Sequence, residues 1–385
     1  MRGRKIIFLI VALLFGFGLN SVSFGFSIDA RAAILMDPLT GKILYAQNEH
    51  QRLPPASVTK VMTMLLIMEA VHQRRVTWDE MIRTSATASR MGGSQVYLKE
   101  GEEYPLRDMF KAIAVVSAND ASAAVAEHLY GSIQDFVEAM NEKAKVLGLK
   151  DTHFANETGL PDPEHYSSAY DLAVISRQLI AKYPEVLKFT SIWLDTFRSG
   201  QFTLRNTNEL IRVYRGADGL KTGHTEEAKF CLSATAKKGD FRLLSVILGA
   251  VSDAKRVAET KRLLDFGYRN FQWKLLQKAG SRVGKVNLKD ASPKQVPVKI
   301  KADFGAVVER GGDQLIKTRL VPKKNLRLPL KPGTVVATYQ ATVNGKVVGA
   351  TEGYSTIKVN RANFLVRWWR SLWDLIHNLW PGKKS

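Results

Sequence analysis

A change in sequence pattern near Lys274 does most to limit the fold of this 385-residue chain. Residues 31–273 mix helical and strand-like patterns, whereas residues 274–360 hold short segments that alternate apolar and polar side chains. Gly and Pro recur between these segments and no helix-length period appears, which is typical of an all-β domain. We therefore predict two folded domains, residues 26–273 and 274–360, which a chain of this length can accommodate.

The first domain shows helical patterns both before and after a set of strands. The apolar run from Val58 to Met68 is long enough for a buried helix. The other expected elements are a hairpin of 33–36 with 43–45, helices at 109–116, 121–129 and 254–266, and strands at 230–236 and 243–248. This order predicts an α/β (α+β) fold in which helices flank a mostly antiparallel sheet.

The N-terminus has the three parts of a secretory signal. Arg2, Arg4 and Lys5 precede an uncharged apolar stretch, 6–19, and small residues follow at 23–25. An uncleaved membrane span is the alternative, but the stretch is shorter than the about 20 residues that a bilayer core requires. We expect residues 1–25 to be removed and the mature protein to act outside the cytoplasm.

The C-terminal segment 361–385 has the pattern of an amphipathic helix. Apolar side chains recur at helical spacing at Phe364, Leu365, Trp368, Trp369, Leu372, Leu375, Ile376, Leu379 and Trp380. Arg367, Arg370 and Asp374 lie on the opposite side, and these charges exclude a membrane span. The pattern predicts a helix that lies in the lipid interface and anchors the protein to the outer face of the cytoplasmic membrane. A terminal helix packed on the protein's own core is the alternative.

The formal charge of +20 is concentrated in the C-terminal third. Residues 274–360 hold 17 basic and 5 acidic side chains, a net charge of +12, and residues 361–385 hold five basic and one acidic, a net charge of +4. Beside a membrane anchor, this charge suits attraction to anionic lipid or wall polymer. The alternative is that the lysines only solvate an exposed sheet. A nucleic-acid partner is not expected outside the cell.

Several familiar kinds of catalytic centre are missing from the sequence. One cysteine and seven scattered histidines, with no HExxH spacing, give no metal site, and no cofactor is expected. There is no GxSxG motif, which disfavours an α/β-hydrolase. Cys231 lies in an apolar strand and is interpreted as a buried small side chain.

A serine and a lysine at helical spacing offer a different chemistry. Ser57 and Lys60 lie three positions apart at the start of the apolar run, so the hydroxyl and the amine can meet on one helix face. A helix N-terminus would also favour a developing anion near Ser57. The spacing alone is weak evidence, because it recurs at Ser252 to Lys255 and at Ser355 to Lys358.

The motifs that follow the Ser57 copy of Ser-x-x-Lys are more specific evidence. Only this copy precedes, at wide spacing, Ser117-Ala118-Asn119 and Lys221-Thr222-Gly223, each of which occurs once. The three motifs are the signature set of penicillin-binding proteins and serine β-lactamases, in the right order. The whole chain resembles the low-molecular-mass D-alanyl-D-alanine carboxypeptidases. The resemblance implies a β-lactamase/transpeptidase-like catalytic domain, a small all-β C-terminal domain and an amphipathic C-terminal helix.

The chemistry needed to cleave a D-Ala-D-Ala terminus gives each motif residue an expected role. Ser57 is expected to be the nucleophile, and Lys60 its base, provided that burial and a nearby cation lower the lysine pKa. Lys221 is the expected cation. Ser117 is expected to relay the proton to the departing nitrogen, and Asn119 to position Lys60 and the substrate.

The remaining residues are expected to bind substrate. Lys221-Thr222-Gly223 reads as an edge strand, on which Thr222 donates to the substrate carboxylate and Gly223 lets the substrate backbone approach. The family resemblance implies an oxyanion hole made by the backbone N–H groups of Ser57 and His224. It also implies that Arg256 binds the terminal carboxylate, although Arg256 could instead be a surface helix cation.

The sequence thus predicts an exported serine carboxypeptidase that removes the terminal D-alanine from peptidoglycan stem pentapeptides and binds β-lactams such as penicillin covalently. A β-lactamase is disfavoured, because Glu157 does not lie in the Glu-x-x-Leu-Asn pattern of those enzymes. A polymer-building transpeptidase would carry a large extra N-terminal region, and a non-catalytic wall-binding module would not need every catalytic group. An endopeptidase uses the same site, so the motifs leave that alternative open.

Overall fold

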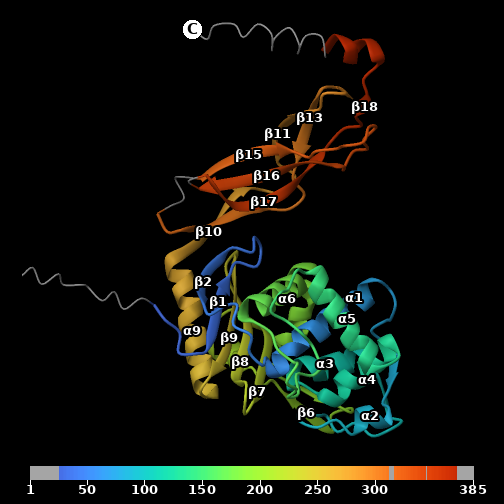
Figure 1. Cartoon of the computed structure of the whole chain (residues 1–385), viewed down its shortest axis with the longest axis vertical. Coiled ribbons are helices and arrows are strands. Elements are labelled where there is room, and N and C mark those ends of the chain that lie inside the picture. The colour runs from blue at the N-terminus through green and yellow to red at the C-terminus, as the bar shows by residue number, and fades with distance from the viewer. Residues whose placement is uncertain (1–25, 312–315, 344, 371–385) are drawn as a thin grey trace, which may run out of the picture.

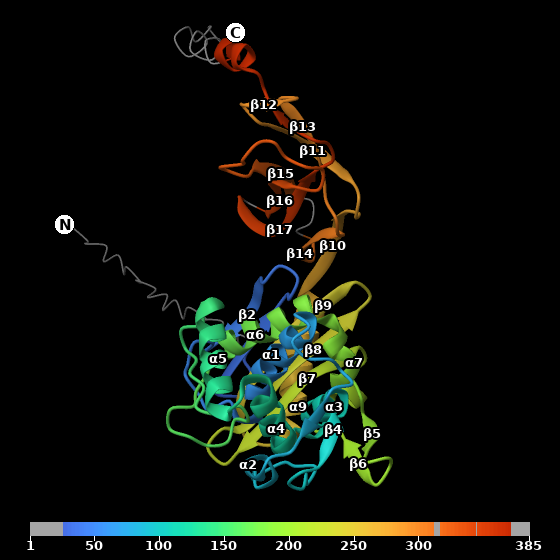
Figure 2. The same ribbon diagram turned by 90° about the vertical axis from the view of Figure 1, so that its right-hand side faces the viewer.

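The computed structural model describes residues 26–311, 316–343 and 345–370. The predicted signal, residues 1–25, and most of the predicted anchor, residues 371–385, lie outside these ranges. Figure 1 shows an α/β body followed by a smaller body of strands, and the view in Figure 2 separates the two equally clearly. The predicted fold class is confirmed.

The α/β body is built on one five-stranded sheet with the order β2-β1-β9-β8-β7, in which every neighbouring pair is antiparallel. The strands are β1 (Ala32–Met36), β2 (Ile43–Gln47), β7 (Ala217–Thr225), β8 (Lys229–Lys238) and β9 (Phe241–Ala250). The predicted hairpin is therefore confirmed as β1 and β2, and the motif Lys221-Thr222-Gly223 lies on the edge strand β7.

Helices cover both faces of this sheet (Figure 1). The long helices are α1 (Lys60–His72), α3 (Leu106–Val116), α4 (Asn119–Tyr130), α5 (Ile133–Val146), α6 (Ala169–Lys182) and α9 (Asp253–Asn270). Successive side chains of a strand point to opposite faces, so Ile34 of β1 joins one buried cluster with α1, and Leu35 joins the other with α9.

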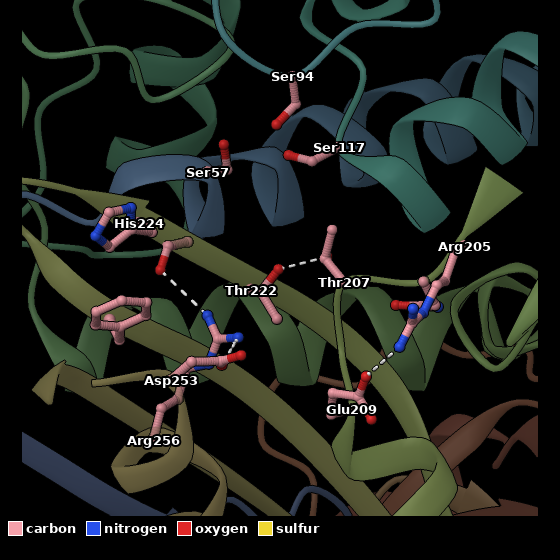
Figure 3. Close-up of a pocket in the computed structure, with 13 residues that line it drawn as sticks. Ser57, Ser94, Ser117, Arg205, Thr207, Glu209, Thr222, His224, Asp253 and Arg256 are labelled. Carbon is pink, nitrogen blue, oxygen red and sulfur yellow. Dashed lines mark hydrogen bonds and ion pairs between the residues drawn. The ribbon is translucent and has the colours of Figure 1, made fainter.

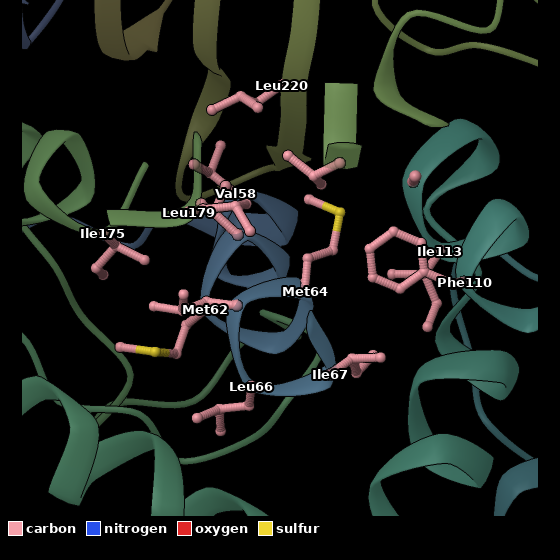
Figure 4. Close-up of a cluster of buried hydrophobic side chains, with 14 of the residues drawn as sticks. Val58, Met62, Met64, Leu66, Ile67, Phe110, Ile113, Ile175, Leu179 and Leu220 are labelled. Atoms are coloured by element: carbon pink, nitrogen blue, oxygen red, sulfur yellow. The ribbon is translucent and has the colours of Figure 1, made fainter. Parts of the chain in front are cut away.

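Helix α1 lies at the centre of the larger cluster, and apolar side chains surround it in Figure 4. Ten of its thirteen residues are buried, and a helix that is apolar all round belongs inside a core. Shorter elements complete this body: η1 (Ala56–Thr59), β3 (Met81–Arg83), α2 (Ala86–Ser89), β4 (Glu103–Pro105), η2 (Pro184–Val186), α7 (Leu187–Thr190), β5 (Leu194–Phe197), β6 (Phe202–Arg205) and α8 (Leu210–Val213).

The second body has its own strands and its own two small cores. Its main sheet has the order β11-β13-β17-β16-β15, and two strand pairs, β10 with β14 and β12 with β18, flank it. The strands are β10 (Phe271–Gln277), β11 (Arg282–Asn287), β12 (Ala291–Ser292), β13 (Gln295–Lys299), β14 (Phe304–Glu309), β15 (Ile316–Pro322), β16 (Val335–Val343), β17 (Lys346–Ser355) and β18 (Asn360–Arg361). The boundary expected after residue 273 lies inside β10, which starts directly after α9 and pairs with β14.

The described start of the tail is helical from 364 to 370. Asn363 accepts a hydrogen bond from the Val366 N–H at 2.9 Å, and Arg370 donates to the carbonyl of Ala291 at 2.8 Å. Phe364 is 70% exposed and Trp369 is 61% exposed, so the apolar side chains of this turn do not pack on the protein. Among the described residues, no helix is both long and apolar enough to cross a bilayer.

Candidate active site

A cleft of about 500 Å³ lies between the start of α1, the α3–α4 turn and the edge strand β7 (Figure 3). Its lining residues are Ser57, Ser94, Ser117, Arg205, Asn206, Thr207, Glu209, Thr222, Gly223, His224, Phe230, Asp253 and Arg256. The three sequence motifs, far apart along the chain, therefore meet at one cavity. Lys60 and Lys221 are buried beside it.

Ser57 lies in the 3-10 turn η1, which leads directly into α1, so it lies on the N-terminal side of that helix, as expected. The backbone at Gly159 packs closely against this turn, because a Cβ at Gly159 would come within 1.9 Å of the Ala56 carbonyl oxygen. A glycine at 159 lets the loop of residues 156–160 pack directly on η1. Ser57 itself stays partly exposed and lines the cleft.

Lys60 places its amine within 3.3 Å of the Ser57 hydroxyl oxygen. The same amine donates to Asn119 Oδ1 at 2.6 Å and to the carbonyl oxygen of Thr158 at 2.8 Å. The side chain is fully buried, and burial lowers the pKa of Lys60 to about 7, against the opposing charges of Glu157 and Asp120. Near neutral pH a large fraction of this amine is therefore uncharged and able to accept a proton.

Of the two causes expected from the sequence for the lowered pKa of Lys60, burial and the nearby cation Lys221, burial is the one that acts. Lys221 is itself 1% exposed, and burial, followed by the charges of Lys60 and Arg256, lowers its pKa well below the ordinary value. Its amine donates to the Thr222 carbonyl oxygen at 3.0 Å.

The second motif forms the turn between α3 and α4. Ser117 ends α3 in the left-handed conformation, with φ of 65°, and Asn119 begins α4. The Asn119 side chain accepts from Lys60 and donates to the Gly92 carbonyl oxygen at 2.6 Å, so its orientation is fixed. The Ser117 hydroxyl is buried at the cleft and has no hydrogen-bond partner among the described residues. It is thus free to bond a substrate.

The edge strand β7 forms the opposite wall of the cleft. Thr222 shares a 2.6 Å hydrogen bond with Thr207, which fixes its hydroxyl at the cavity. A Cβ on Gly223 would lie 2.7 Å from the Pro55 carbonyl oxygen and 3.0 Å from the Ser57 nitrogen, so only glycine allows the strand to lie this close to η1. His224 is exposed, and its ring packs on Phe230 with centroids 4.2 Å apart.

Arg256 reaches the cleft from the first turn of α9. Its guanidinium lies over the Phe230 ring at 5.7 Å, donates to the Cys231 carbonyl oxygen at 3.4 Å and forms an ion pair with Asp253. It is only 5% exposed, and burial lowers its pKa, opposed by Asp253. The alternative that Arg256 is a surface cation is therefore wrong.

The weaker candidates have structural explanations. Ser252 caps α9 by accepting from the Lys255 N–H, and Ser355 lies in β17, so neither of the other Ser-x-x-Lys copies faces a lysine amine at a cleft. Cys231 is fully buried, as expected. His165 is buried, and burial lowers its pKa to about 4, so it stays neutral and bonds Thr59 Oγ1 at 2.7 Å. Among the described residues, no group of three or more His, Cys, Asp or Glu side chains could hold a metal ion.

Sequence reasoning missed part of the cleft. Ser94 lines it, and so do Arg205 and Glu209, which form an ion pair at 3.0 Å. Thr207 lies in the stretch Asn206-Thr207-Asn208, a composition typical of a turn. Asn206 does play that part, accepting from the Asn208 N–H at 2.8 Å, but Thr207 between them points into the site.

An antiparallel sheet flanked by helices, with a serine next to a buried lysine and a Lys-Thr-Gly edge strand across the cleft, defines the class of penicillin-recognising serine enzymes. A family model described as D-alanyl-D-alanine carboxypeptidase matches residues 20–252, and one described as the C-terminal domain of penicillin-binding protein 5 matches residues 271–361. The chain belongs to the D-alanyl-D-alanine carboxypeptidase family.

Individual relatives agree with this family. The chain is 40% identical over 350 residues to the D-alanyl-D-alanine carboxypeptidase DacF of Bacillus subtilis (strain 168), covering 90% of each. It is 37% identical over 311 residues to DacD of Escherichia coli (strain K12), covering 79% of this chain and 80% of the relative. Penicillin-binding protein 5 from Haemophilus influenzae has a similar structure, with a TM-score of 0.75 and 32% identity over 87% of this chain and 98% of that one. This chain is thus a serine peptidase with D-alanyl-D-alanine carboxypeptidase activity.

Proposed function

We propose that Ser57 carries the acyl-enzyme through which this carboxypeptidase removes the terminal D-alanine from peptidoglycan stem pentapeptides. The observation that carries the proposal is the 3.3 Å approach of the Lys60 amine, with its pKa lowered to about 7, to the Ser57 hydroxyl. Neutral Lys60 takes the hydroxyl proton while Ser57 Oγ bonds the carbonyl carbon of the penultimate D-alanine. Ser117, whose hydroxyl lacks a partner among the described residues, passes that proton to the amide nitrogen, and D-alanine leaves.

A water molecule then attacks the ester, gives its proton to Lys60 and releases the shortened peptide, while Ser57 recovers its proton. The negative carbonyl oxygen of both steps is held by the N–H groups of Ser57 and His224, whose approach the side-chain-free Gly223 supports. Thr222, with Lys221 behind it and Arg256 beside it, supplies the side of the cleft that receives the substrate carboxylate. A β-lactam offers the same acyl group and carboxylate, so it would be trapped as an ester on Ser57.

The test follows the mass of a stem pentapeptide and the labelling by a fluorescent penicillin. The wild-type chain should remove a single D-alanine and take the label, and Ser57→Ala should abolish both. Ser252→Ala is the matched control, because it removes the serine of another Ser-x-x-Lys copy and only a helix cap. Labelling that persists in Ser57→Ala would refute the assignment. Separation of cross-linked dimers into monomers by the wild-type chain would add an endopeptidase activity.

We also propose that the protein is exported and held at the outer face of the cytoplasmic membrane by residues 361–385. The charged n-region and apolar stretch of residues 1–25 support export. Exposure of Phe364, Leu365, Trp368 and Trp369 on the described start of the tail supports an apolar face that is left for lipid. Removing residues 361–385 should therefore release the protein from membranes, as fractionation would show.

A further inference from the structure

A buried carboxyl group close to Lys60 has no part in the mechanism above. Glu157 lies in the loop that supports the lysine: the next residue, Thr158, accepts from the Lys60 amine, and the Glu157 carbonyl oxygen accepts from Thr63 at 2.6 Å. The Glu157 side chain is 1% exposed. Its Oε1 atom is buried without a hydrogen-bond partner among the described residues.

A second buried carboxyl group near Lys60, that of Asp120, differs from Glu157 in its hydrogen bonds. It is the other carboxylate whose charge acts on Lys60, and it is also buried. Asp120 accepts from the backbone N–H groups of Val96, Leu98 and Ala121, at 2.9–3.2 Å, so both of its carboxylate oxygens are hydrogen-bonded. Glu157 has no such set of donors, and burial raises its pKa. A buried carboxylate that lacks hydrogen-bond donors is stabilised strongly by a nearby positive charge.

We propose that Glu157 is a positioning residue that governs how readily Lys60 gives up its proton. When Glu157 is ionised it holds the proton on the lysine, and when it is neutral or absent it lets the lysine act as a base. The proposal rests on the proposed role of Lys60. The motif set does not include this residue, and the loop backbone alone would not require a carboxyl group here.

Other charged groups around the pair come from several elements. Asp120 on α4 acts on Lys60 in the same direction as Glu157, whereas Lys60, as a like charge, lowers the pKa of Lys221 on β7. Burial keeps His165 neutral near pH 7. Glu127 on α4 is a like charge for Glu157 and favours its neutral form. Among these groups only Glu157 is a buried acid with an unpartnered oxygen that also interacts with Lys60.

The experiment measures the rate constant for acylation by a fluorescent penicillin from pH 5 to pH 9 in the full-length protein. The acid limb of this profile reports the pKa of the base in the free enzyme. Glu157→Gln removes the charge that favours protonated Lys60, so the acid limb should move down by about one pH unit, which is about a tenfold gain in rate at low pH. Glu157→Met introduces an apolar side chain of similar length and is the second variant, in case the buried amide of Glu157→Gln prevents folding. It should give the same shift of the acid limb.

Glu69→Gln is the control, because it removes a carboxylate of α1 that is paired with Lys143 and acts on neither Lys60 nor Glu157. Its acid limb should stay in place. An unmoved acid limb in both Glu157 variants, or a uniform loss of rate at all pH values, would overturn the proposal and leave Glu157 with a purely structural role. A wild-type chain that is not acylated at all would instead refute the proposed function, so the two failures are distinguishable.

Discussion

The two bodies of this protein treat charge in opposite ways. The α/β body buries Lys60, Lys221 and Arg256, each 5% exposed or less, together with Asp120 and Glu157. In the described residues from 271 to 370, the only buried polar side chain is Ser355, and basic side chains such as Lys317 and Arg319 lie exposed on β15. Burying a charge costs several kcal/mol, which a large core can offset and a small one cannot. Chemistry is therefore confined to the larger body, and the smaller one offers a charged surface.

The largest effect on the acylation rate should follow from a substitution that prevents β7 from lying close to η1. In Gly223→Ala the new Cβ would meet backbone atoms of Pro55 and Ser57, which cannot rotate away, so the strand must move away from η1 and from the proposed oxyanion site. A displacement on the order of 1 Å costs about 100-fold in rate. Penicillin acylation should fall by at least about that factor.

The same substitution in the other body is the control. In Gly353→Ala the Cβ would meet the side chain of Val298, which belongs to the core of the β domain. We expect the acylation rate to stay at the wild-type value, even if the β domain loses some stability. Equal losses in the two variants would show that the bodies are not separate in function.

A smaller effect concerns stability in acid. His165 is buried and neutral with a pKa of about 4, whereas an unfolded histidine titrates near 6.5. Between these values the unfolded chain binds more protons, so the free energy of unfolding falls as the pH drops from about 6.5 to 4, by up to about 3 kcal/mol. Residues 271–370 contain no histidine, and the β domain should not lose stability by this route.

Calorimetry at pH 7 and pH 4.5 would measure this difference. The unfolding temperature of the α/β body should fall on acidification in the wild-type chain, and His165→Gln should reduce the fall. The Gln variant keeps a side chain able to bond Thr59, so its stability at pH 7 serves as the control. An unchanged acid dependence in His165→Gln would mean that other groups control it.

The sequence predicted helices and strands well where apolar residues recur with a single helical or strand period. The helix after Ser57, the hairpin of 33–36 with 43–45 and the edge position of Lys221-Thr222-Gly223 all follow from local patterns, and the structure contains each of them. Local spacing also explains why Lys60 can reach Ser57. The meeting of the three motifs at one cleft came from the family resemblance, because spacing along the chain says nothing of contacts across about 60 to 160 residues.

The sequence could not predict contacts made by backbone atoms or between residues that are distant along the chain. The Thr158 carbonyl that holds Lys60 carries no side-chain signature, and the Thr207 hydroxyl bonds a strand 15 residues away. The pKa of Lys60 depends mainly on burial, which is a property of the whole core, so the sequence could name burial and Lys221 as causes but could not rank them. The boundary predicted after residue 273 lies inside β10, because this strand starts at Phe271 and continues directly from α9.

The smallest effect on chemistry should come from removing residues 361–385. The described start of this segment contacts the β domain: Arg361 pairs with Ala291, the Ala362 N–H donates to the Asp290 carbonyl oxygen, and Arg370 donates to the carbonyl oxygens of Lys289 and Ala291. No lining residue of the cleft lies beyond Arg256. The truncated chain should therefore cleave a soluble pentapeptide at the wild-type rate while it no longer sediments with membrane vesicles. Trp368→Ala with Trp369→Ala in the full chain is the milder version, because it removes exposed aromatic area and keeps every charge. Vesicle binding that survives both changes would assign membrane attachment to the basic sheet, whereas a loss of soluble activity would show that the two bodies are coupled through the tail.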